Sequence, residues 1–138
     1  MTITVIGTPA PQGSKRHVGN GVMIESSKLV KPWREDVKAA VMLAYPAGGR
    51  RDAVLIHGPV ELEIVFTLRR PKSAKRGALP DRKPDLSKLI RSTEDAMTEV
   101  GVFEDDARIV RLIAEKLYQC EPGALGMPGA VITVQAAQ

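Results

Sequence analysis

Apolar residues recur in this chain with two periods, one typical of strands and one typical of helices. Residues 60–66 largely alternate apolar and charged positions, which predicts a strand with one buried face. In residues 32–45, Trp33, Val37 and Val41 fall on one side of a helix. The same reasoning predicts helices over 32–45 and 86–99, and strands over 2–6, 22–24, 60–66, 108–118 and 129–134.

The order of these elements, β-β-α-β-α-β-β, predicts the fold class. Two helices among about five strands favour an α+β domain, a mixed sheet of about four to five strands with two main helices packed on it. A chain of 138 residues, 43% of them apolar, buries one core of ordinary size. We therefore expect a single domain over 1–138, in which residues 69–84 form a long exposed basic loop.

Charge is distributed unevenly along the chain, although the formal net charge is only +4. Residues 69–83 hold seven basic side chains and one acidic side chain, Asp81. Residues 94–106 hold six acidic side chains and no basic one. The candidate DNA contacts are the basic side chains of the loop and two near the N-terminus: Lys15, Arg16, Arg69, Arg70, Lys72, Lys75, Arg76, Arg82 and Lys83.

Composition excludes several other classes of site. Cys120 is the only cysteine, which excludes an intrachain disulfide and a cysteine-rich zinc site. Only 4% of residues are aromatic, so contacts to backbone phosphate fit better than base stacking. No apolar run approaches the roughly 20 residues of a membrane span, and residues 2–6 do not resemble a signal peptide. We expect a soluble cytoplasmic protein.

Two acidic positions flank the second predicted helix. Asp85 precedes its first residue, and Asp105 and Asp106 stand at the entrance of the next strand. Converging carboxylates are ligands for Mg²⁺ or Mn²⁺, and beside a basic surface they suggest phosphodiester chemistry. The structural alternatives are a helix N-cap at Asp85 and a turn at Asp105 and Asp106. A tight turn at Gly101 would bring Asp106 to the helix flank, but spacing does not decide whether it reaches Asp85.

The helix itself offers further candidates. Glu94 lies seven residues after Ser87 and so on nearly the same face, with Arg91 between them. Arg91 and Glu94 fit an exposed ion pair, whereas Lys88 and Arg91 also fit contacts to phosphate or to charge that develops in a transition state. Asp95 lies opposite the apolar face.

Three segments together resemble a known family. They are residues 83–89 (KPDLSKL), residues 95–98 (DAMT) and residues 101–110 (GVFEDDARIV). This combination is similar to the RusA family of Holliday junction resolvases, which are encoded largely by phages and prophages. The opening PAPQGSKR, residues 9–16, is similar to the proline-rich start of that family. The good match covers about a third of the chain.

The resemblance implies a homodimeric, Mg²⁺-dependent endonuclease that makes paired symmetric nicks in four-way DNA junctions. It implies that Asp85 is the first essential aspartate and that Asp106, with Asp105 beside it, is the late one. It places Arg91 where the family has a functional lysine, and Asp95 at an acidic position further along the helix.

Ser87 departs from the family pattern, which usually reads Asp-Leu-Asp where this chain has Asp85-Leu86-Ser87. A hydroxyl is a poor replacement for a carboxylate at a hard metal ion. Three alternatives stay open: Glu94 supplies the missing carboxylate, water completes the metal's coordination, or the protein binds junctions and cuts them poorly. The leading hypothesis is thus a junction endonuclease, and the alternatives are a non-catalytic junction-binding protein and a small basic interaction protein.

Overall fold

Four strands form the main sheet of the protein, for which a computed structural model describes residues 1–13, 15–17, 23–25, 28–46 and 54–138. The strands are β1 (Thr2–Ile6), β4 (Val60–Leu68), β5 (Ile109–Tyr118) and β6 (Gly129–Ala136), in the spatial order β1-β6-β4-β5. β6 is antiparallel to both of its neighbours, whereas β5 runs parallel to β4. The sheet is therefore mixed, with β1 and β5 at its two edges.

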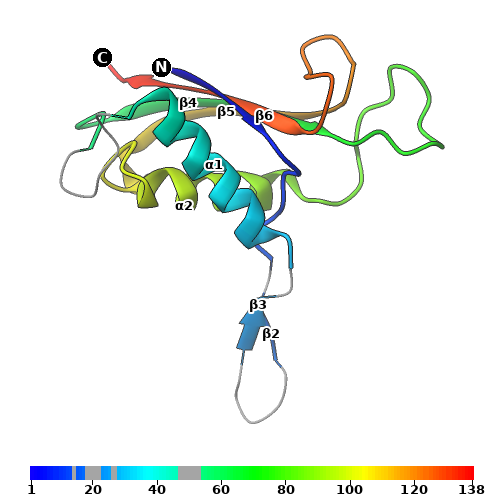
Figure 1. Cartoon of the computed structure of the whole chain (residues 1–138), viewed down its shortest axis with the longest axis horizontal. Helices are drawn as coiled ribbons and strands as arrows, with labels where there is room; N and C mark the ends of the chain where they lie inside the picture. The colour runs from blue at the N-terminus through cyan, green and yellow to red at the C-terminus, as the bar shows by residue number, and fades with distance from the viewer. Residues whose placement is uncertain (14, 18–22, 26–27, 47–53) are drawn as a thin grey trace.

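Helices α1 (Val30–Ala44) and α2 (Leu86–Glu99) lie side by side on one face of this sheet (Figure 1). In β4, Leu62, Ile64 and Phe66 are buried beneath the helices, while the alternating acidic residues face the opposite side. This is the arrangement that the alternating pattern predicts. The α+β class, the two covering helices and the mixed sheet are confirmed.

The two helices are joined by a buried hydrogen bond as well as by apolar packing. The indole Nε1 of Trp33 donates to Thr93 Oγ1 at 3.1 Å, and both residues are fully buried. Thr93 in turn donates to the carbonyl oxygen of Leu89 at 2.8 Å. A buried indole N–H needs such a partner, so this contact fixes how α1 sits against α2.

The predicted strand over 22–24 is not part of the main sheet. Residue 22 lies outside the described residues, and β3 (Met23–Glu25) pairs with β2 (Lys15–His17) in a separate hairpin. Figure 1 shows this hairpin projecting from the helical side of the molecule. The chain leaves the sheet after β1 because residues 7–13 follow α2 instead, with Gln12 N donating to Lys88 O at 2.9 Å. The sheet has four strands for this reason.

The other predicted elements agree closely with the structure. α2 has the predicted bounds, 86–99, and β5 and β6 begin within one residue of their predicted starts. α1 begins two residues earlier than predicted, and β4 and β6 each extend two residues further. None of the described helices has both the length and the apolar character that crossing a membrane requires.

Candidate active site

Acidic side chains gather where α2 ends and β5 begins. Gly101, at φ 83°, follows α2, and the chain turns back so that Val102 N donates to Met97 O at 2.9 Å. Only glycine adopts this left-handed conformation at little cost. A short 3₁₀ helix, Asp106–Arg108, then leads into β5. The turn thus returns Asp106 to the flank of α2, as the sequence predicts.

Among these acidic residues, Glu94 has the pKa that is most clearly affected by its surroundings. The pKa of this half-buried carboxyl is raised from 4.5 to about 7, mainly by burial and in part by the nearby charges of Asp106 and Asp95. Arg91 offsets part of this effect. Like charges that raise one another's pKa must lie close together, so these three carboxyl groups share one region.

Asp105 and Asp106 have different roles in the adjoining turn. Asp105 is the N-cap of the 3₁₀ helix, and its Oδ1 accepts a hydrogen bond from Ala107 N at 3.0 Å. A hydrogen bond with Asp106 is the main cause that lowers the pKa of Asp105 and raises the pKa of Asp106. The structural role that turn propensity suggests therefore holds for Asp105.

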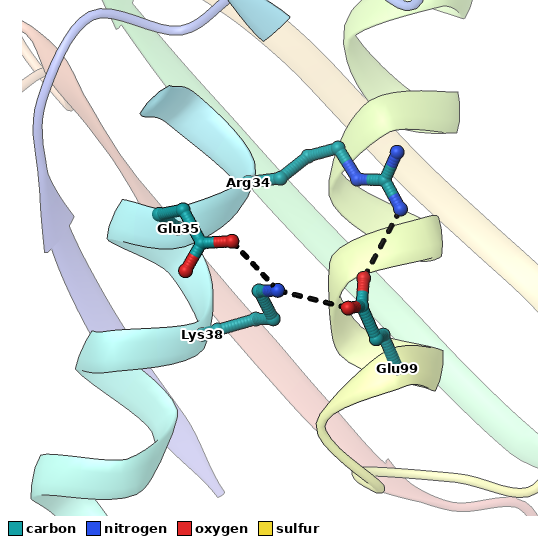
Figure 2. A network of polar contacts seen from close by, with 4 residues as sticks. All are labelled: Arg34, Glu35, Lys38 and Glu99. Atoms are coloured by element: carbon teal, nitrogen blue, oxygen red, sulfur yellow. Dashed lines mark hydrogen bonds and ion pairs between the residues drawn. The ribbon is translucent and has the colours of Figure 1, made fainter. Parts of the chain in front are cut away.

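An open pocket of about 610 Å³ adjoins this acidic region. Its charged and polar lining is mainly acidic, with Arg34 as its cation. The other lining residues with charged or polar side chains are Asp95, Thr98, Glu99, Glu104, Asp105 and Asp106. Arg34 reaches across from α1, and its Nη2 donates to Glu99 Oε2 at 3.1 Å (Figure 2). Lys38 donates to the other oxygen of Glu99 at 2.9 Å and lies 2.8 Å from Glu35, as Figure 2 also shows.

The hydrogen bond from Lys38 is the main cause that lowers the pKa of Glu99, so this carboxylate is ionised at neutral pH and holds the end of α2 against α1. Nothing in the local sequence around Arg34 predicts that it borders the acidic pocket. Its position follows from the packing of α1 on α2, which is a long-range property.

Asp85 stands apart from this cluster. It occupies the N-cap position of α2, but its side chain makes no capping hydrogen bond and lies 3.7 Å from Lys88 Nζ. Asp85 is not among the charges that act on Glu94 or on Asp106. Nine residues of helix separate it from Glu94, or roughly 13 Å along the axis. The structure therefore brings Glu94, Asp95, Asp105 and Asp106 together and leaves Asp85 at the other end of α2.

The N-terminal half of α2 is covered by residues 9–13, the start of the proline-rich opening. Ser92, fully buried, donates from Oγ to Ala10 O at 2.6 Å, which joins this segment to the helix. Ser87 is exposed at the first turn of α2, and Arg91 is exposed one turn later. The opening thus supports the helix that carries the candidate side chains.

The basic loop, residues 69–84, is held by a few specific contacts. Glu121, in the turn after β5, pairs with Arg70 and accepts from Gly77 N at 2.8 Å. The Arg70 guanidinium also lies 5.7 Å from the centre of the Tyr118 ring. Figure 1 shows this loop and the turn after β5 at the same end of the sheet. Arg70 therefore organises the loop instead of extending into solvent.

The other basic side chains of this loop are exposed. They are Arg69, Lys72, Lys75, Arg76, Arg82 and Lys83. At the loop's end, Lys116 Nζ donates to Arg82 O at 2.7 Å and to Pro84 O at 2.9 Å, which places β5 directly beside the residue that precedes Asp85. Lys15 and Arg16 lie in β2, and their side chains are outside the described part of the protein.

The site combines an aspartate at the N-terminus of α2, a turn that returns Asp105 and Asp106 to this helix, and a basic loop. This combination agrees with a known family. Residues 6–125, most of the chain, match the family model described as endodeoxyribonuclease RusA. The chain belongs to the RusA family. It is therefore an endodeoxyribonuclease of the Holliday junction resolvase class, with junction DNA as its substrate. No curated protein sequence matches the chain.

RusA-family nucleases are typically metal-dependent, and the donor set here fits a hard cation in its chemistry. Burial is the main cause that raises the pKa of Glu94 to about 7, and the charges of Asp106 and Asp95 contribute, so a positive ion among these carboxylates would relieve their repulsion. In the described part of the chain, however, no three histidine, cysteine or acidic side chains converge as a complete set of ligands. The residue types fit a metal ion.

Proposed function

We propose that this protein is a Mg²⁺-dependent, structure-selective endonuclease that resolves four-way DNA junctions by paired symmetric nicks. Mn²⁺ is the expected substitute for Mg²⁺. The family establishes the junction substrate. We propose the metal requirement, the homodimer and the site residues. The observation that carries them is the set of carboxyl groups that act on one another's pKa where α2 meets β5. We further propose a phage or prophage origin, a role in recombination and repair, and action in the bacterial cytoplasm.

We expect Asp106 to hold the ion, with Asp105 and Asp95 close by, and Asp85, which lies at the other end of α2 in the same chain, to join them only from a second subunit. Glu94 is the proposed substitute for the carboxylate that the family pattern places at Ser87, because it is half-buried and the charges of Asp106 and Asp95 act on it. A bound divalent ion supplies an activated water and offsets the charge of the attacked phosphate. Without such a cation the acidic pocket would repel the DNA backbone, which supports the metal requirement.

The basic residues have two distinct roles in this proposal. Lys88 and Arg91, on α2 near Asp85 and Glu94, contact the scissile phosphate and stabilise the charge that develops on it. The exposed cations of the basic loop grip the duplex arms through backbone phosphates, without reading base sequence. A homodimer would match its own two-fold symmetry to that of the junction and place two centres on opposite strands.

One observation keeps a second candidate function open. Ser87 stands where the family pattern has a carboxylate. This difference supports a junction-binding protein that has lost cutting activity. It would bind four-way DNA tightly and show no turnover with either metal ion.

The test compares a four-way junction with linear duplexes that carry the same arm sequences, each end-labelled and incubated with Mg²⁺, Mn²⁺ or chelator. We expect paired, symmetric nicks only in the junction and only with metal. Equal cutting of the linear duplexes would contradict structure selectivity. Junction binding without nicks in either metal would contradict the enzyme proposal and favour the binding protein.

A further inference from the structure

A lysine lies on the covered side of β5, where the neighbouring strand carries the core. Lys116 is aligned with Phe66 of β4, which is fully buried beneath the helices. Residues in register on adjacent strands share a face of the sheet, so the side chain of Lys116 leaves β5 on the helical side. A lysine in such a place is uncommon, because its ammonium group needs water or hydrogen-bond acceptors. Its ammonium group therefore needs a specific partner at this position.

Two backbone carbonyl groups are that partner. Lys116 Nζ donates to Arg82 O at 2.7 Å and to Pro84 O at 2.9 Å. Pro84 O belongs to the peptide group that joins Pro84 to Asp85. Hydrogen bonds from an ammonium group are stronger than those between neutral groups, so they hold this segment of the chain firmly. Two of the three ammonium protons are used in this way, which suits the lysine to holding the backbone better than to gripping DNA.

The backbone of Asp85 is thereby fixed on both sides. The peptide group before it is held by Lys116. Its own carbonyl oxygen accepts hydrogen bonds from Lys88 N at 3.1 Å and from Leu89 N at 3.0 Å. The side chain of Asp85, in contrast, makes no capping hydrogen bond. The direction of its carboxylate therefore depends on the orientation of its backbone, and a rotation of the preceding peptide group would turn it.

We infer that Lys116 is a positioning residue for Asp85. In this role it contacts neither the metal ion nor the DNA, and acts by orienting the peptide group from which the aspartate extends. The inference rests on the proposed function for the role of Asp85 in metal binding. Substitution of this lysine should therefore slow the cutting of a bound junction and leave the binding of the junction unchanged.

The other end of β5 is far from this contact. β5 begins at Ile109, directly after the short helix that carries Asp106. Lys116 is seven positions further along, or roughly 23 Å in a strand. Loss of the lysine contacts should therefore disturb Asp85 and leave the acidic cluster around Asp106 as it is. The expected effect is thus local.

Two variants of Lys116 test this role by separating junction binding from cutting. Lys116→Met keeps the apolar stem and removes the hydrogen-bond donors, whereas Lys116→Arg keeps donors and charge. We expect Lys116→Met to lower the nicking rate at saturating junction and Mg²⁺ by about tenfold to a hundredfold, as a misplaced group does. Its Kd for the junction, measured in chelator, should stay within about twofold of that of the unaltered chain. Lys116→Arg should recover most of the rate.

Arg111→Met is the matched control, because it removes a cation from the same strand. Arg111 is exposed and aligned with Glu61 of β4, on the face of the sheet that the helices leave open. We expect this variant to bind and to cut the junction as the unaltered chain does.

Limited proteolysis measures the same contact without DNA or metal. Trypsin, with its cleavage sites identified by mass spectrometry, should cut Lys116→Met faster after Arg82, because Arg82 O has lost its donor. Cleavage after Lys72, near the end of the loop that Glu121 holds, should keep its rate and serves as the internal control. Lys116→Arg should protect Arg82 again.

Undiminished nicking by Lys116→Met would overturn the inference. A loss of junction affinity as large as the loss of rate would also overturn it, because Lys116 would then be a DNA contact. So would a failure of Lys116→Arg to restore either readout. If the unaltered chain cuts no junction with either metal ion, the proposed function fails by itself. Faster cleavage after Arg82 in Lys116→Met would then still support the contact with the backbone before Asp85, and unchanged cleavage would overturn it.

Discussion

Individual residues in the acidic cluster have separable roles, although they are close in sequence. Asp105 caps a turn through its hydrogen bond with Ala107 N, while Asp106 carries a pKa raised mainly by its hydrogen bond with Asp105, and its charge acts on Glu94. The sequence predicts both aspartates as ligands and leaves a turn as the alternative. The structure assigns the turn role to Asp105, which makes Asp106 the stronger candidate for metal binding.

Glu94 should make folding stability depend on pH. Its folded pKa of about 7 lies above the unfolded value near 4.5, so its protonated form stabilises the folded state. That contribution is complete below about pH 4.5 and is lost as the pH rises through 7. In metal-free buffer, Glu94→Gln should be more stable than the unaltered chain at pH 8 by about 1 kcal/mol after allowance for partial exposure, with little difference at pH 4.5.

Urea unfolding at the two pH values measures this difference. Glu63→Gln, an exposed glutamate on the open face of β4, is the matched control and should show no such gain. If Glu94→Gln gains no stability at pH 8, the ionised Glu94 carboxylate is not destabilised by its burial and by the charges of Asp106 and Asp95.

At the scale of elements, the packing of α1 on α2 sets the shape of the acidic pocket. The buried contact between Trp33 and Thr93 orients the helices, and the contacts of Arg34 and Lys38 with Glu99 hold the end of α2. Helical periodicity predicts which faces are apolar. It does not predict that Arg34 borders a pocket on the neighbouring helix, because that depends on how the two helices cross.

Thr93→Val should destabilise the protein by about 1–3 kcal/mol, because it leaves the buried indole N–H of Trp33 without its acceptor. Thermal or urea unfolding measures the loss. Thr98→Val is the matched control in the same helix, since Thr98 Oγ1 is buried without a hydrogen-bond partner among the described residues. We expect that variant to be neutral or slightly stabilised. Equal effects of the two substitutions would show that the hydroxyl of Thr93 does not hold the helices.

The basic loop depends on one carboxylate at its base. Glu121→Ala removes the partner of Arg70 and of Gly77 N, so the loop should open more often. Limited trypsin digestion should then cut faster after the loop's basic residues than in the unaltered chain. Glu115→Ala, on the exposed edge of β5, serves as the control and should leave the loop's cleavage rate unchanged; acceleration in both would mean that Glu121 has no special role.

At the scale of the whole molecule, local patterns predict most of the fold and only part of the site. In β4 and α2 the buried positions are mostly apolar residues, so the strand alternation and the buried helix face can be predicted from the sequence. The hairpin of β2 and β3 departs from the predicted sheet because residues 7–13 follow α2. The contacts of Lys116 with Arg82 and Pro84 join residues more than thirty positions apart, and no local pattern predicts them.

The most direct test of the catalytic centre is the rate at which Asp106→Asn and Asp85→Asn make paired nicks in a four-way junction with Mg²⁺. Glu63→Gln, an acidic residue remote from the pocket on the open face of the sheet, is the control. We expect both aspartate variants to lose cutting while they still bind the junction, and the control to cut as the unaltered chain does. Undiminished nicking by Asp106→Asn would contradict the claim that the carboxylates where α2 meets β5 form the catalytic centre.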